Sequence, residues 1–141
     1  MASFQSTVEV AADPVAAFGF LNDLSNLTKW DPSIRKAESI SDSTTGMGAK
    51  SRVVVGFYGR PIETTYEIVK AERPSQIVID VDGKVSGKIQ LSIAATATGS
   101  TIGYRAEASM KGLARLLDKG LKLAFEGIGE NVVASMRKVL V

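Results

Sequence analysis

The stretch 34–110 alternates apolar and polar residues over most of its length, with short turns between the alternating segments. Residues 62–70 are the clearest case, because Ile62, Tyr66 and Ile68 share one parity whereas both glutamates take the other. A period of two is typical of strands that have one buried face. Strands joined by short turns form an antiparallel meander. We therefore predict strands at 34–40, 49–58, 62–70, 77–82, 85–95 and 101–110, preceded by one at 3–10.

Residues 112–141 contain no proline and keep a helical periodicity. A helix of about 29 residues spans roughly 40 Å, and a meander with one apolar face needs such a cover. Before the meander, Asp13-Pro14 predicts the start of a short helix, Asn22-Asp23 predicts its end and the start of a second one, and Trp30-Asp31-Pro32 ends the helical region. The predicted class is α+β: about seven antiparallel strands, curved around a long C-terminal helix, with two short helices after the first strand.

The face of the long helix that should point to the sheet is small in its middle and polar toward its C-terminal end. Each mid-helix glycine costs about 1 kcal/mol relative to alanine, so Gly120 and its neighbours need an explanation. Either the sheet bends tightly onto the helix, or a ligand fills a void there. Asn131 favours the void, because an inward amide needs partners. The full predicted inward face is Leu113, Leu117, Gly120, Ala124, Ile128, Asn131 and Ser135.

Composition excludes several function classes. The chain has no Cys and no His, so it has no disulfide, no thiolate nucleophile and none of the commonest metal ligands; we expect no metal and no cofactor. The net charge is +2 with both signs spread along the chain, which is too sparse a basic footprint for a nucleic-acid partner. We see no signal peptide and no membrane span. We expect one cytoplasmic domain over residues 1–141, as a monomer or weak homodimer.

Polar residues on the inward parity are candidate site residues. Tyr66 and Tyr104 are either core tyrosines with backbone partners or groups that orient a ligand, and Ser6 and Thr64 carry the same ambiguity. Trp30 is predicted to pack the short helices onto the sheet, with a gating role as the alternative. The neighbouring aspartate is most simply explained as part of a turn.

The strand at 34–40 allows two orientations. If Ile34 and Ile40 point inward, Lys36 and Glu38 do so too, and a buried pair would have shifted pKa values. The alternative, which we favour, is an edge strand whose charged side chains meet water.

The order of these elements resembles the START/Bet v 1-like (SRPBCC) superfamily. The most specific pieces are 18–32, which contains Asn-Asp-Leu-Ser-Asn-Leu-Thr-Lys-Trp-Asp-Pro, and 99–118, with the spacing of Thr101, Tyr104, Lys111-Gly112 and Arg115. The chain looks most like the polyketide cyclase/dehydrase-like branch and is also similar to the G subunit of carbon monoxide dehydrogenase. The resemblance covers essentially the whole chain and implies a helix-grip fold with a deep cavity between sheet and C-terminal helix. It carries no catalytic signature, so it implies fold better than function.

Two functions follow from the resemblance. The first, which we favour, is a non-catalytic binder or carrier of an apolar, lipid- or polyketide-like molecule; the second is a cofactor-free polyketide cyclase or dehydratase. An aldol-type cyclisation needs a general acid and base near neutral pH, and without His the chain would have to use tyrosine, a shifted Glu38 or ordered water. An inward carboxylate or lysine would favour the enzyme. We assign no catalytic residue, and we expect the ligand to contact Ser6, Trp30, Thr64, Tyr66, Tyr104, Leu117, Gly120, Ala124, Ile128 and Asn131.

Overall fold

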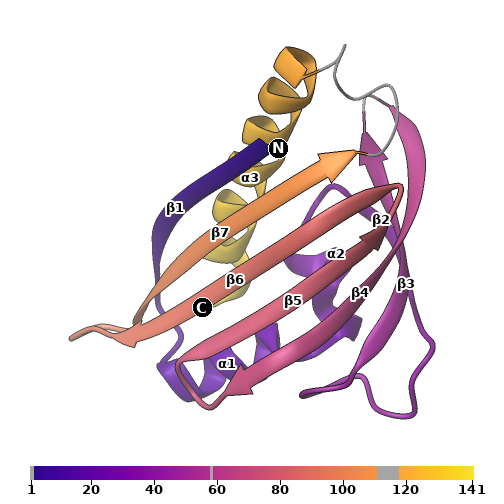
Figure 1. Cartoon of the computed structure of the whole chain (residues 1–141). Coiled ribbons are helices and arrows are strands. Elements are labelled where there is room, and N and C mark those ends of the chain that lie inside the picture. The colour runs from indigo at the N-terminus through magenta and orange to yellow at the C-terminus, as the bar shows by residue number, and fades with distance from the viewer. Residues whose placement is uncertain (1, 58, 111–117) are drawn as a thin grey trace.

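The computed structural model describes residues 2–57, 59–110 and 118–141, and the side chains of 3–56, 59–109 and 126–141. It has the predicted α+β helix-grip architecture (Figure 1). In chain order the elements are β1 (Ala2–Val10), α1 (Pro14–Leu21), the 3₁₀ turn η1 (Leu24–Asn26), α2 (Leu27–Trp30), β2 (Ile34–Ser39), β3 (Lys50–Phe57), β4 (Arg60–Glu72), β5 (Gln76–Gly83), β6 (Val85–Ala95), β7 (Ser100–Met110) and α3 (Asp118–Val139).

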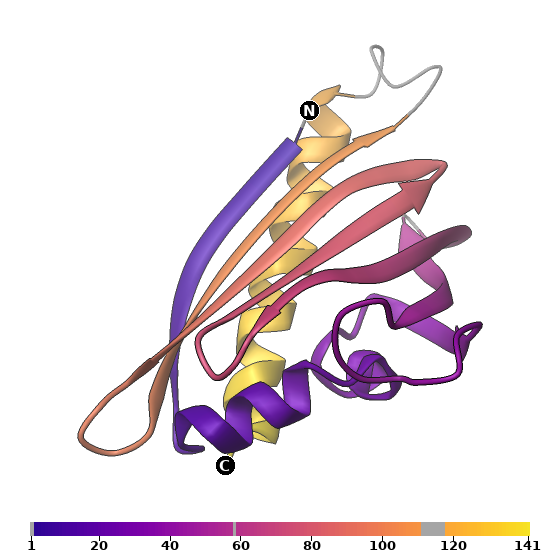
Figure 2. The same cartoon turned by 60° about the horizontal axis from the view of Figure 1, so that its bottom comes forward.

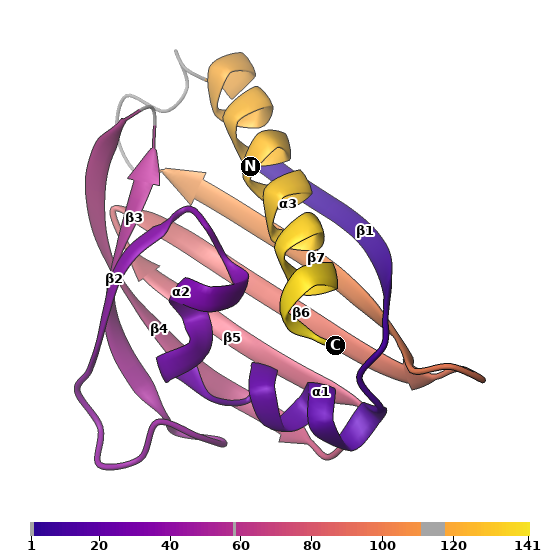
Figure 3. The same cartoon turned by 180° about the vertical axis from the view of Figure 1, so that it is seen from behind.

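The seven strands form one antiparallel sheet in the order β1-β7-β6-β5-β4-β3-β2. The sheet curves, and α1, α2 and α3 all lie on its concave side, as Figures 2 and 3 show. Helix α3 packs along the β1 edge, and α2 packs between α3 and β2. The Ser135 hydroxyl donates a hydrogen bond to the Lys29 carbonyl at 2.9 Å, which ties α3 to α2. The long helix and the short helices thus cover opposite halves of the concave face.

The predicted strand parity is confirmed by burial. Ile68, Ile79, Leu91 and Ile102 are fully buried on the concave face. Trp30 is also fully buried, in the same apolar cluster as these strand residues. Burial of this kind stabilises by about 25 cal/mol per Å² of apolar surface, so the alternating pattern is what fixes the register of the sheet.

Strand β2 is an edge strand with a register shift between Ile34 and Lys36. The extra residue reverses the parity after Ile34, so Ile34 and Ala37 face the core whereas Lys36 and Glu38 are exposed. The orientation with an inward Lys36 and Glu38 is therefore wrong, and the favoured edge-strand orientation is confirmed. A bulge at a sheet edge has this effect because it inserts one unpaired residue.

The inward face of α3 differs from the predicted one. Val132, Met136 and Leu140 are buried at a spacing of four residues, whereas Asn131 is exposed. The predicted inward orientation of Asn131 is therefore wrong. Turning the apolar side chains at 132, 136 and 140 toward the sheet buries more apolar surface than turning the predicted face with Asn131 and Ser135 would. Gly129 is buried against the Phe4 ring, so at this position a close contact explains the glycine.

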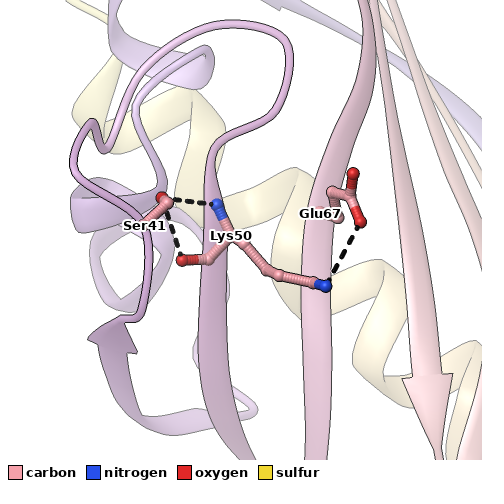
Figure 4. A network of polar contacts seen from close by, with 3 residues as sticks. All are labelled: Ser41, Lys50 and Glu67. Atoms are coloured by element: carbon pink, nitrogen blue, oxygen red, sulfur yellow. Dashed lines mark hydrogen bonds and ion pairs between the residues drawn. The ribbon is translucent and has the colours of Figure 1, made fainter.

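The convex face of the sheet is polar. Near the β2–β3 connection, the Ser41 hydroxyl accepts a hydrogen bond from the Lys50 backbone N–H at 2.9 Å, and the Lys50 ammonium lies 3.7 Å from the Glu67 carboxylate (Figure 4). The ion pair joins β3 to β4, and exposed pairs of this kind contribute little to stability. The Ser41 hydrogen bond joins the β2–β3 connection to the start of β3. None of the helices in the described part of the chain is long and apolar enough to cross a membrane.

Candidate functional site

A small cavity lies between the concave face of the sheet, α3 and the corner where α2 leads into β2. Its volume is about 50 Å³, which accommodates a few water molecules. A ligand of polyketide size would need the cavity to widen. The described lining residues are Asp31, Ser33, Val55, Thr64, Tyr66, Val81, Val85, Ser86, Ile89, Tyr104, Ala106, Glu107, Ala108 and Ile128.

Tyr66 and Tyr104 bring phenol groups to this mainly apolar lining. Tyr66 stands on β4 opposite Val81, and Tyr104 stands on β7. The Phe4 ring packs against Tyr104 with a centroid distance of 6.1 Å and a tilt of 56°. Phe4 in turn fills the space left by the missing side chain of Gly129. The contact series from Gly129 through Phe4 to Tyr104 therefore sets where the Tyr104 ring lies.

Asp31 supplies a carboxyl group to the same cavity. It follows α2 directly and is 2% exposed. Its Oδ1 accepts hydrogen bonds from the Ser33 backbone N–H at 2.9 Å and from the Ser33 hydroxyl at 2.6 Å. Burial raises the pKa of Asp31 to about 6 against the opposing effect of these two bonds, because desolvation disfavours the charged form.

The charge of the Asp31 carboxylate affects the pKa values of the two phenols. Burial raises the pKa of Tyr66 and of Tyr104 well above the ordinary value, and the negative charge of Asp31 raises both further. Both phenols therefore stay protonated at any ordinary pH and can donate hydrogen bonds. No lysine or arginine stands among the described lining residues. The described cavity thus combines mainly apolar walls with the carboxyl groups of Asp31 and Glu107 and two phenols.

Thr64 has a structural explanation. Its hydroxyl lies 2.7 Å from the Asp82 carbonyl and 3.0 Å from the Val85 carbonyl and donates toward both. These contacts hold the β5–β6 hairpin against β4. Thr64 is therefore satisfied within the protein, although it lines the cavity.

The structure brings together four of the residues predicted to contact a ligand, namely Thr64, Tyr66, Tyr104 and Ile128. Trp30 is buried in the core and is not part of the described lining. Ser6 is half-buried beside Tyr104 and lies outside that lining too. Asn131 is exposed on the outer side of α3. Leu117 lies outside the described residues, as do the surroundings of Gly120 and the side chain of Ala124, so their predicted roles stay predictions.

Asp31 is the residue that the sequence interpretation missed. The motif Trp30-Asp31-Pro32 explains a turn fully, and a turn aspartate is usually exposed. One signal could have found it: the aspartate adjoins a large aromatic residue at the end of an apolar helical segment, so the corner itself was a candidate for burial. Among the residues that the structure describes, no three His, Cys, Asp or Glu side chains lie together as metal ligands do.

Solved structures similar to this one define the class of fold. The protein TTHA0849 from Thermus thermophilus superimposes with a TM-score of 0.80 at 13% identity, over 97% of this chain and 94% of that one. A START superfamily protein from Mycobacterium smegmatis gives a TM-score of 0.74 at 15% identity, over 98% and 96% of the two chains. The di-domain ARO/CYC protein StfQ of the steffimycin biosynthetic pathway gives 0.73 at 14% identity, and the match covers 98% of this chain but 50% of StfQ. These similarities show a START-like fold.

The family follows from the sequence itself. The family profile described as polyketide cyclase / dehydrase and lipid transport matches residues 1–141, and the chain belongs to this family. No curated protein matches the chain. The predicted superfamily and branch are thus confirmed, whereas the similarity to the G subunit of carbon monoxide dehydrogenase is not shown and stays a prediction.

Proposed function

We propose that the protein binds a small, mainly apolar molecule with one polar group in the cavity between the sheet and α3. The observation that carries this proposal is the placement of Asp31, Tyr66 and Tyr104 around one cavity whose other walls are largely apolar. Membership of a family described by lipid transport and polyketide chemistry supports it.

Energetics favour a ligand with a polar group. A polar group that lines a mainly apolar cavity can gain a hydrogen bond from a ligand that carries a polar group of its own. Among the described residues the hydroxyls of Tyr66 and Tyr104 form no hydrogen bond with one another or with a neighbour, and both hydrogen bonds to Asp31 fall on Oδ1. A ligand with apolar bulk and one polar group would satisfy these groups and fill the remaining space.

Saturable binding of an apolar fluorescent dye tests the proposal. We expect Tyr66→Phe and Tyr104→Phe to change the dye affinity severalfold, because each removes one hydroxyl without changing the shape of the wall. Asp42→Asn, at an exposed loop position, is the control and should leave the affinity unchanged. Ala124→Leu, at a position still predicted to face the cavity, should abolish binding without loss of thermal stability. A wild type that binds no apolar dye would refute the proposal.

Acid–base catalysis is the second candidate function, and Asp31 is the observation that favours it. A carboxyl group with a pKa of about 6 is suited to proton transfer near neutral pH. In an aldol-type cyclisation, the carboxylate would take a proton from the carbon next to a carbonyl. The enolate would attack a second carbonyl, and the new alkoxide would take the proton back while a tyrosine hydroxyl donates to it.

Binding and catalysis are separable by experiment. If the protein is a cyclase, Asp31→Asn should abolish turnover of a poly-β-ketone substrate but keep binding of the dye. Tyr104→Phe should lower turnover less, because it removes only one hydrogen-bond donor. Equal turnover by wild type and Asp31→Asn would exclude this role for Asp31.

A further inference from the structure

Resting on the proposed function, we infer that the cavity selects neutral ligands that carry a hydroxyl group, such as phenols or enols, and rejects carboxylates, with Asp31 as the specificity-determining residue. The geometry of Asp31 and the charges of the groups that line the cavity favour this class of ligand.

Among the described residues, the hydrogen bonds to the Asp31 carboxyl group fall on one of its two oxygens. Both Ser33 donors bind Oδ1, at 2.9 and 2.6 Å. No other described residue donates a hydrogen bond to the carboxyl group. Oδ2 is therefore the acceptor that a ligand hydroxyl can reach, and a buried carboxylate accepts stronger hydrogen bonds than a neutral oxygen does.

The charges around the cavity disfavour an anion. The titratable groups of the described lining are Asp31, Glu107, Tyr66 and Tyr104, and all four are acids. Of these four groups, Glu107 forms an ion pair in the described part of the chain: the Arg105 guanidinium lies 2.8 Å from its carboxylate, and both side chains are partly exposed. Within the described lining, a bound carboxylate would meet the charge of Asp31 without a compensating lysine or arginine, and such repulsion is strong where water is excluded.

A ligand hydroxyl group can form hydrogen bonds both with the Asp31 carboxylate and with a tyrosine of the cavity. Its proton can go to Asp31 Oδ2 while its oxygen accepts from Tyr66 or Tyr104, which stay protonated and so remain donors. An ammonium group could also donate to Asp31, but it carries two or three donors and must give up its hydration for one carboxylate in an apolar cavity. The observations therefore favour the neutral hydroxyl.

Three single-ring probes test the selectivity: p-cresol, p-toluate and p-xylene, which share a tolyl group and differ in one substituent. Each has a single ring, so it requires less widening of the cavity than a polyketide would, and the dissociation constants can be measured by ligand-observed NMR titration at about pH 7.5. We expect p-cresol to bind about tenfold more tightly than p-xylene, since one hydrogen bond to a charged group is worth at least that factor. We expect p-toluate to bind more weakly than both.

Asp31→Asn provides the variant, with Asp42→Asn as the matched control. Asn retains an Oδ1 that can accept from Ser33, so the corner should fold, which a thermal melt checks. The variant should lose the preference for p-cresol over p-xylene and bind p-toluate more tightly than wild type does. Asp42→Asn should behave as wild type. If Asp31→Asn fails to fold, the wild type at about pH 5 replaces it, because Asp31 is then mostly protonated while p-toluate keeps its charge.

The outcomes separate this inference from the proposed function. If p-xylene binds saturably but p-toluate binds as tightly as p-cresol, or if Asp31→Asn keeps the wild-type preference, the selectivity inference is overturned and the binding function stands. Tighter binding of 4-methylbenzylammonium than of p-cresol also overturns it, in favour of a cationic ligand. If none of the probes binds, both fail.

Discussion

Gly127 and Gly129 lie two residues apart in α3 in opposite environments, so alanine at each should have opposite effects. Gly127 is exposed, and a Cβ built there meets no described atom within 4 Å. At Gly129 the added Cβ would collide with the Phe4 ring, lying 2.6 Å from Cε1 and closer still to two other ring carbons. Real Cβ contacts are longer, so the ring must move, and it packs against Tyr104.

The expected magnitudes follow from two contributions. Replacing a mid-helix glycine by alanine gains about 0.5–1 kcal/mol in helix stability at either position. Overpacking against a ring costs about 1–3 kcal/mol, and only Gly129→Ala incurs that cost. Gly127→Ala should therefore stabilise by about 0.5–1 kcal/mol. The difference between the two variants isolates the packing contribution, because the helix contribution cancels, and should be about 1–3 kcal/mol.

Urea unfolding of wild type and both variants measures these differences as changes in midpoint at constant m-value. Gly129→Ala should also change the affinity for p-cresol, because the displaced Phe4 ring pushes on Tyr104, whereas Gly127→Ala should not. Equal unfolding midpoints for the two variants would refute the contact series from Gly129 to Tyr104. A destabilised Gly127→Ala would refute the assignment of that residue to the exposed side of α3.

Three further predictions concern the sheet, the cavity and the first helix. Leu91→Ala should destabilise by about 2–5 kcal/mol because Leu91 is fully buried, whereas Gln90→Ala, on the convex face, should stay within about 0.5 kcal/mol; equal unfolding midpoints would contradict the parity. The pKa of Asp31 is raised to about 6 from an ordinary 3.8, so ionisation of Asp31 opposes folding. As the pH rises from about 4 to about 6, the free energy of unfolding of the wild type should therefore fall by about 3 kcal/mol relative to that of Asp31→Asn. A difference between the two proteins that does not change with pH in urea unfolding would exclude this. Asp13→Ala should cost about 1 kcal/mol, because the Asp13 carboxylate caps α1 by accepting from the Ala16 N–H at 2.9 Å; an unchanged melting temperature would show that the cap contributes nothing.

The strands were predictable because each carries its own signal. The alternation in β4 and β6 fixes which residues face the core, and the observed burial of Ile68 and Leu91 agrees with it. The helix caps are equally local, as Asp13 shows. Local signals suffice here because the sheet is antiparallel and each strand pairs with a neighbour in sequence except at β1, which pairs with β7.

The inward face of α3 was not predictable from periodicity alone. Starting the stripe from the leucines at 113 and 117 and advancing by 100° per residue leads to Asn131, whereas the buried residues are Val132 and Met136. Two stripes that differ by one residue fit the sequence almost equally, and the choice depends on what the helix packs against. Phe4 decides part of it, because its ring needs the space at Gly129.

The candidate site was predictable only in part, for the same reason. Tyr66 and Tyr104 follow from strand parity. Asp31 belongs to a corner whose burial depends on how α2 packs against β2 and α3. The adjoining Trp30 is a local signal that this corner could be buried, but it does not show that the carboxyl group lines the cavity.

The fold does not need a carboxylate at position 31. The corner between α2 and β2 needs an acceptor for the two Ser33 donors, and an asparagine Oδ1 would provide one without a charge. The carboxylate instead carries the desolvation penalty that raises its pKa to about 6, and it faces two phenols and no lysine or arginine within the described lining. A group that costs stability and that a neutral isostere could replace structurally is the pattern expected of a functional residue. A stability gain in Asp31→Asn, accompanied by loss of the preference for p-cresol, is the combination that a purely structural turn aspartate would not produce.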